Sequence, residues 1–324
     1  MTYKKKITVL SGIIASLAII YILSVVFDYE RTGSRSALYF WLDPGQKNNI
    51  EGITISNVEE TIALVRKGDE WFISRNGRDY PARRVRVEDF IGTLIRRAPY
   101  PVLSSSVSSH ERLSLTEDRS IQITVTGKGG QSLLNLLIGI GDITGQNVHM
   151  RKQGQNEVRS GEDIFSTYVR STLASWYNLR LFPESEEGRL DATGVQRLTV
   201  YPPPTDDGEN VPPRIFTRSG REWTFSGFEL NNPGMGRVDG YIRDILGTSG
   251  DNFIEDIEPS DPMFNNSRIV LELGNGTIRT IRLGPSDESG RRLAVISGSN
   301  WVYSLPVWAS MRLFADAETF ERDY

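Results

Sequence analysis

Residues 68–74 read GDEWFIS, and residues 220–226 read GREWTFS. Gly68 corresponds to Gly220 and Trp71 to Trp223, 152 positions further along the chain. Glycine permits the tight turn that precedes a strand, and a tryptophan on that strand offers a large ring to cover a helix. We therefore interpret Gly68, Trp71, Gly220 and Trp223 as the core signature of a repeated fold. The rival interpretation is that the two tryptophans stack on a ligand.

The residues around the first motif alternate in polarity as strands do, and they then change to a helical spacing. Apolar positions recur every three or four residues between 81 and 99, which predicts a helix ended by Pro99. The pattern predicts strands at 53–57, 61–68 and 70–74, hairpins at 120–142 and 147–160, and a second helix at 161–178.

The residues around the second motif repeat this order. The corresponding strands are expected at 197–201, 214–220 and 222–226, the helix at 236–247, the hairpins at 268–285 and 291–304, and the end of the second helix at 305–314. Several matches in one order predict two repeated α+β domains with antiparallel sheets. We place them at 50–183 and 195–315, with a polar linker at 184–194 and a C-terminal tail at 316–324.

The N-terminal region predicts a membrane anchor. Residues 7–27 carry no charge and, as a helix, would span about 31 Å, close to the thickness of a bilayer core. Lys4, Lys5 and Lys6 in the tail 1–6 favour a cytoplasmic N-terminus. A cleaved signal peptide is the alternative, but its apolar region would be shorter. We expect one transmembrane helix, a juxtamembrane segment at 28–49 and extracytoplasmic domains.

Composition excludes some functions and leaves few catalytic candidates. The chain has no cysteine, which rules out disulfides and thiolate chemistry, and its net charge of −4 argues against nucleic acid as a partner. The only histidines are His110 and His149, and no metal-binding or nucleophile motif surrounds them. We therefore expect no enzymatic activity, no cofactor and no metal.

Two segments are candidates for contact with other molecules. In the loop 202–213, PPPTDDGENVPP, proline favours an extended conformation that loses little entropy on docking. Its candidate residues for binding a partner are Pro202, Pro203, Pro204, Asp206, Asp207, Pro212 and Pro213. An inert surface insertion is the alternative. Tyr39, Phe40 and Trp41 follow the predicted anchor and suit either the membrane interface or the start of the first core.

The order of strands, tryptophan motif, helix, glycine-turned hairpin and final LRLF resembles a bacterial domain-of-unknown-function family in a tandem copy. The matching pieces are 68–71, 81–94, 120–142, 156–158 and 175–182, with a looser second set at 220–223, 238–246, 269–284, 300–303 and 313–314. That family is found as an auxiliary component of gliding-motility-type ABC transporters. The loop 202–213 departs from the simple form of the domain.

The resemblance implies a function without catalysis. It implies a membrane-anchored extracytoplasmic accessory subunit of an ABC-type transport complex, which acts by protein–protein interaction. Its expected partners are an ABC-2-type permease and an associated extracytoplasmic subunit. The expected location is the bacterial inner (cytoplasmic) membrane, with the C-terminal domains periplasmic or otherwise extracytoplasmic. The alternative is an envelope glycan- or lipid-binding protein that works without a transporter.

Overall fold

The computed structural model describes residues 38–183, 190–205, 207–227, 235–315 and 317–320, together with Ser16, Leu17, Ile19 and Tyr21. Among these residues, no helix is both long and apolar enough to cross a membrane. The predicted anchor at 7–27, apart from those four residues, lies outside the described part of the chain, as do Lys4, Lys5 and Lys6. Most of the linker 184–194 and of the tail 316–324 lies outside it as well.

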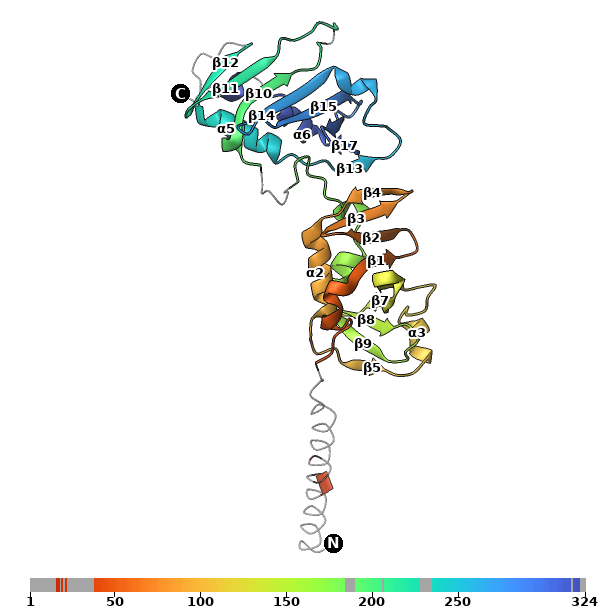
Figure 1. The fold of residues 1–324 in the computed structure, drawn as a ribbon. Coiled ribbons are helices and arrows are strands. Elements are labelled where there is room, and N and C mark those ends of the chain that lie inside the picture. Colours follow the sequence, from red (N-terminus) through yellow and green to blue (C-terminus); the bar gives the residue numbers. More distant parts are fainter. Residues whose placement is uncertain are drawn as a thin grey trace, which may run out of the picture. The chain divides into compact units, whose positions relative to one another are not determined.

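The first sheet contains nine strands (Figure 1). They are β1 (Ile50–Ser56), β2 (Thr61–Lys67), β3 (Glu70–Arg75), β4 (Arg78–Pro81), β5 (Val102–Ser104), β6 (Ile121–Gly127), β7 (Ser132–Gly141), β8 (Asn147–Lys152) and β9 (Val158–Glu162). The helices in this part of the chain are α2 (Arg84–Ile95), α3 (Ser108–Arg112) and α4 (Ile164–Val169), with 3-10 turns at Pro44–Asn49, Lys128–Gly130 and Leu173–Ser175.

The second sheet contains eight strands. They are β10 (Val195–Tyr201), β11 (Arg214–Ser219), β12 (Glu222–Ser226), β13 (Asn252–Ile254), β14 (Ser267–Leu273), β15 (Ile278–Ser286), β16 (Arg292–Ile296) and β17 (Val302–Leu305). The helices are α5 (Met235–Leu246) and α6 (Val307–Leu313), with 3-10 turns η4 (Ala192–Gly194), η5 (Pro262–Asn265) and η6 (Ala317–Phe320).

The two sheets have corresponding strand orders. The first runs β4-β3-β2-β1-β6-β7-β8-β9-β5, and the second runs β12-β11-β10-β14-β15-β16-β17-β13. Apart from β4, each strand has a counterpart at the same place. Irregularities in register also correspond: β1 shifts after Ile50 and β10 after Val195, while β7 shifts after Ile138 and β15 after Leu283. The predicted α+β class with antiparallel sheets is confirmed.

The strands and helices follow the periodicities that predicted them, with one exception. In β1, Ile53 and Ile55 are buried at alternate positions, as a sheet with one covered face requires. The helix expected at 161–178 is wrong in its length, because the chain forms only α4 there. Gly161 and Glu162 belong to β9 and pair with β8, and a 3-10 turn forms further on at Leu173–Ser175. The strand β4 was not predicted.

The contacts divide the chain into two compact units. Unit 1 contains residues up to Arg66 and Glu88–Ser171, and unit 2 contains Lys67–Val87 and Thr172–Tyr324. The hairpin of β3 and β4 thus belongs to unit 2 by its contacts, although both strands are hydrogen-bonded members of the first sheet. The predicted limits of the repeats, 50–183 and 195–315, stay a prediction. They rest on sequence similarity, whereas the two units are defined by contacts, so the units do not test them.

Equivalent segments precede the first strand of each repeat. In unit 1, Tyr39 forms an antiparallel bridge with Ala98, just beyond α2. In unit 2, Arg180 forms one with Ser249, just beyond α5. Trp41 and Leu42 are 2% exposed, so part of the segment 28–49 contributes to the core of unit 1.

Two aspartate-capped turns also correspond between the repeats. Asp142 Oδ1 accepts hydrogen bonds from the backbone N–H and the hydroxyl of Thr144, and Asp287 Oδ1 accepts the same pair from Ser289. Hydrogen bonds from Asn147 and Thr144 lower the pKa of Asp142 to about 2, because they stabilise its charged form. The pKa of Asp287 is lowered for the same reason, chiefly by Ser289.

Candidate functional site

The predicted signature residues occupy matching places. Gly68 and Gly220 have φ angles of +64° and +66°, a left-handed conformation that glycine adopts without strain. Trp71 in β3 is 3% exposed and Trp223 in β12 is 1% exposed. Their rings are covered by the protein itself, which leaves no open face on which a ligand would stack.

The contacts of Trp223 explain why the motif precedes a helix. Its indole N–H donates to Asp239 Oδ1 on α5 at 3.3 Å. The guanidinium of Arg218 lies 4.4 Å from the ring centroid and forms an ion pair with the same carboxylate. Arg66 and Glu88 occupy the corresponding positions in the first half of the sequence. The motif therefore fastens the third strand of the repeat to its helix.

The proline-rich loop is an exposed connection between β10 and β11. Its tip closes on itself, because Gly208 N–H donates to the Thr205 carbonyl at 2.8 Å and Thr205 N–H to that of Glu209 at 2.9 Å. Among its candidate residues, Pro204, Asp207 and Pro212 are exposed, the other prolines are half-buried, and Asp206 lies outside the described residues. The loop does not bring its candidate side chains together with any second predicted site.

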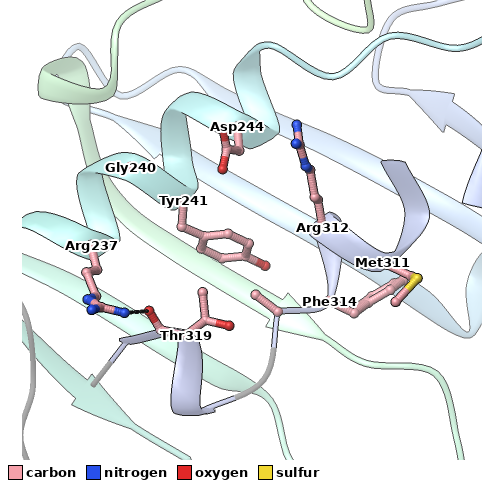
Figure 2. Close-up of a pocket in the computed structure, with 9 residues that line it drawn as sticks. Arg237, Gly240, Tyr241, Asp244, Met311, Arg312, Phe314 and Thr319 are labelled. Carbon is pink, nitrogen blue, oxygen red and sulfur yellow. Dashed lines mark hydrogen bonds between the residues drawn. The ribbon is translucent and has the colours of Figure 1, made fainter. Parts of the chain in front are cut away.

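A groove lies beside the loop's base, between α5 and the segment from α6 to η6 (Figure 2). Its volume is about 510 Å³. It is lined by Arg237, Gly240, Tyr241, Asp244, Met311, Arg312, Phe314, Ala315 and Thr319. Arg214, the first residue of β11, donates to the Ala315 carbonyl, so the loop's end is tied to the groove's lining.

The walls of the groove are fixed by hydrogen bonds to backbone carbonyls. Tyr241 OH donates to the Leu313 carbonyl at 2.6 Å, and Arg237 donates to that of Thr319 at 3.4 Å. Burial raises the pKa of Tyr241, so its phenol stays neutral and does not serve as a base. Figure 2 shows Asp244 and Arg312 toward one end of the groove and Arg237 and Thr319 toward the other.

The outer side of α6 is apolar and exposed beside this groove. Val307 is 39% exposed, Trp308 55% and Met311 71%. We call these three residues the α6 face. Arg312, which follows Trp308 by one helical turn, places its guanidinium 5.3 Å from the indole centroid. Exposed tryptophan, methionine and arginine are the residue types enriched at protein–protein interfaces.

Sequence reasoning missed both the groove and the α6 face. The sequence pattern predicts the stretch LPVWASMRLF at 305–314 only as the end of a helix. The sequence carries no usable signal for them, because only the structure shows that Ala309, Ser310 and Leu313 supply the buried side of that helix. Trp308 and Met311 therefore fall on its other side, where large apolar residues need a cover that the helix does not provide.

The remaining candidates for catalysis or metal binding are the histidines and the carboxylates. His110 Nε2 contacts the Asn156 carbonyl at 3.0 Å, and His149 Nδ1 contacts the Ile140 carbonyl at 2.7 Å, so both imidazoles contact backbone carbonyls. Over the described ranges, no group of three histidine, aspartate or glutamate side chains is arranged to hold a metal ion.

A second pocket, of about 550 Å³, lies elsewhere in unit 2. Trp301 is half-buried in its wall, and its indole N–H donates to the Asp79 carbonyl at 2.9 Å. The other lining residues are mostly polar and include Lys67, Arg78, Asp79, Glu258 and Asn300, with Phe72 and Pro259. This combination of two aromatic rings, Trp301 and Phe72, with amide and charged groups suits a polar ligand such as a sugar.

The fold and these surfaces define an α+β protein built on two antiparallel sheets of corresponding order, with an exposed apolar face next to a groove. Residues 71–226 match the family described as Domain of unknown function (DUF4340). The match covers just under half of the chain and begins and ends near the two signature tryptophans, so it spans one period of the repeat. It supports the expected resemblance to a domain-of-unknown-function family.

The other comparisons gave no relatives. No curated protein matches the chain, and no solved structure does either.

Proposed function

We propose that the protein is a membrane-anchored extracytoplasmic accessory subunit of an ABC-type transport complex, and that it acts by binding another subunit. The observation that carries this proposal is the α6 face. Val307, Trp308 and Met311 expose apolar area on one short helix. Covering such a solvent-exposed apolar surface with a partner is favourable, because it removes the apolar area from water.

The partner we assign to the α6 face is the extracytoplasmic subunit that accompanies an ABC-2-type permease. The groove beside the face presents Arg237 and Arg312 as well as Asp244, so polar contacts can surround an apolar centre. That arrangement is typical of specific protein interfaces. The assignment to a transporter rests on the family resemblance and on the uncharged segment 7–27, with the three lysines before it.

The test is co-purification from native membranes. The chain carries a C-terminal tag, the membranes are solubilised gently, and the recovered proteins are quantified by mass spectrometry. We expect an ABC permease, its ATPase and an extracytoplasmic subunit in stoichiometric amounts. Recovery of the chain alone, with chemical cross-linking before solubilisation also giving no transporter subunit, contradicts the proposal.

The alternative function is binding of an envelope glycan without a transporter. The second pocket favours it, because Trp301 offers part of a ring beside Asp79 and Asn300. Calorimetry with soluble fragments of peptidoglycan and of envelope polysaccharide distinguishes the two functions. Saturable heat with one fragment that disappears in Trp301→Ala, together with an empty co-purification, makes the glycan function the better account.

A further inference from the structure

We propose that one edge of unit 1 rests on the lipid surface of the membrane in which the chain is anchored, with anionic headgroups as the ligand; this rests on the anchor in the proposed function. The surface, which we call the β5 edge, consists of Leu38, Tyr39, Phe40, Val102, Leu103 and Val107. Figure 1 shows β5 next to β9 in this part of unit 1.

Short-range contacts hold the β5 edge together. Tyr39 and Ala98 exchange backbone hydrogen bonds of 3.0 and 3.1 Å, which ties the start of the described chain to the segment that leads into β5. Val102 pairs with Arg159 across β5 and β9, so the two side chains share a face of the sheet. The guanidinium of Arg159 lies 4.0 Å from the Tyr39 ring centroid. These contacts place Tyr39 and Val102 in one patch.

The β5 edge is apolar where sheet edges are usually protected by charge. Leu38 is 65% exposed, Val102 47%, Leu103 50% and Val107 62%. Strand β5 ends the order of the first sheet, and residues 98–109 contain no acidic or basic side chain. An uncharged, apolar sheet edge of this kind invites association unless something covers it.

Cations on aromatic rings surround the apolar residues. Lys152 Nζ lies 5.2 Å from the Tyr39 ring centroid, and the Arg97 guanidinium lies 5.6 Å from that of Phe40. Within the described part of the chain, neither cation has a carboxylate within ion-pair distance. Aromatic rings with nearby lysine and arginine are the combination that suits the headgroup region of a bilayer, especially an anionic one.

Two of the nearby carboxylates are neutralised. Glu162 forms an ion pair with Arg96, and Glu157 forms one with Arg159. The groups named here carry four positive charges, on Arg96, Arg97, Lys152 and Arg159, against the two carboxylates. This local excess of positive charge favours contact with anionic headgroups.

The chain's own sequence brings the β5 edge to the membrane. Only residues 28–37 separate the uncharged segment 7–27 from Leu38. Fully extended, that connection reaches at most about 40 Å, so the edge is always held close to the bilayer. Binding to the lipid surface is then intramolecular, and a modest affinity suffices to keep the edge docked.

The test uses the absence of cysteine from the chain, which allows a single fluorescent label at a chosen position. Full-length Leu103→Cys is labelled and reconstituted in vesicles of phosphatidylcholine and phosphatidylglycerol, some of which contain lipids with a nitroxide on the headgroup. The matched control is Val58→Cys in the β1–β2 turn, 87% exposed and about 24 Å away across five strand spacings. Circular dichroism checks the fold of both variants.

We expect the label at position 103 to lose most of its fluorescence in nitroxide vesicles while the label at 58 keeps it. Omission of phosphatidylglycerol, or the added change Lys152→Gln, should restore part of the lost fluorescence.

Equal, weak quenching at both positions overturns the inference. Shielding of position 103 from water without quenching by the lipid also overturns it, and assigns the edge to a protein partner instead. Release of the chain by a carbonate wash overturns the inference and the anchor together. Quenching at position 103 together with a co-purification that recovers no transporter subunit supports the inference and contradicts the proposed function.

Discussion

Two segments of unit 2 share a sequence pattern and differ in what covers them. LASWYNLRLF at 173–182 and LPVWASMRLF at 305–314 agree at Leu, Trp and the final Arg-Leu-Phe. Trp176 is fully buried, whereas the corresponding Trp308 is 55% exposed. Leu179 is 8% exposed, and the corresponding Met311 is 71% exposed.

Specific contacts account for the burial of the first segment. Gly250 N–H donates to the Leu179 carbonyl at 2.9 Å, and Leu181 N–H donates to that of Thr248 at 3.0 Å. The guanidinium of Arg86 lies 4.8 Å from the Trp176 ring centroid. Residues 311–313 instead continue the helix α6 and lack a comparable bridge among the described residues. A repeated sequence therefore does not imply a repeated environment, and the uncovered copy is the better candidate for a partner.

The largest expected effect distinguishes the two tryptophans. Trp176→Ala should lower the free energy of unfolding by about 3–5 kcal/mol, because it removes a large buried ring and leaves a cavity. Trp308→Ala should change it by no more than about 0.5 kcal/mol, because the ring is mostly in solvent. Chemical denaturation of both variants in the same detergent measures the difference. Similar losses would mean that the α6 face is part of the core.

The next effect tests the fastening of strand to helix. Arg218→Met should cost about 2 kcal/mol, because it leaves the partly buried Asp239 carboxylate without its cation. Arg66→Met at the equivalent position should cost a similar amount if the repeat signature works alike in both halves. Thermal unfolding of the two variants checks the equivalence, and a neutral Arg66→Met would confine the signature's role to the second half.

A smaller effect concerns the wall of the groove. Tyr241→Phe should cost about 1–2 kcal/mol, since it leaves the buried Leu313 carbonyl without the donor at 2.6 Å. The corresponding residue of the first half is Phe90, which has no hydroxyl and therefore provides the control for the hydrogen bond of Tyr241. Phe90→Tyr should not stabilise the protein. A stabilised Phe90→Tyr would show that an acceptor equivalent to Leu313 exists there.

The smallest effect is a dependence on pH. The lowered pKa of Asp142, about 2 against an ordinary 3.8, means that its contribution to stability is present above about pH 4. That contribution disappears as the pH falls through about 2. Asp142→Asn should flatten this part of the profile of stability against pH, and Asp287→Asn should flatten it in the same direction. An unchanged slope in both variants would exclude the two turns as its origin.

The sequence predicted the repeated elements well because their causes are local. Gly68 and Gly220 form the turns, and Trp71 and Trp223 each follow three residues later. Two similar short sequences therefore predict two similar local structures. The paired turns of Asp142 and Asp287 have the same local cause and were readable as D-x-T-G and D-x-S-G.

The candidate surfaces were not predictable in the same way, because exposure depends on what packs from elsewhere. Nothing within LPVWASMRLF distinguishes Trp308 from the buried Trp176. The helix predicted at 161–178 is too long, because Gly161 and Glu162 pair with β8 and only α4 forms within that range. Contacts between distant parts of the chain decided both outcomes.

The most direct test of the central claim measures how tightly the co-purified transporter subunits bind the α6-face variants. Binding of the purified ABC permease complex with its extracytoplasmic subunit is compared for the wild type, Trp308→Ala and the matched surface control Val58→Ala. The account predicts at least about 30-fold weaker binding for Trp308→Ala, a loss of about 2 kcal/mol typical of a central interface residue, and no change for Val58→Ala. Wild-type affinity in a folded Trp308→Ala protein would contradict it.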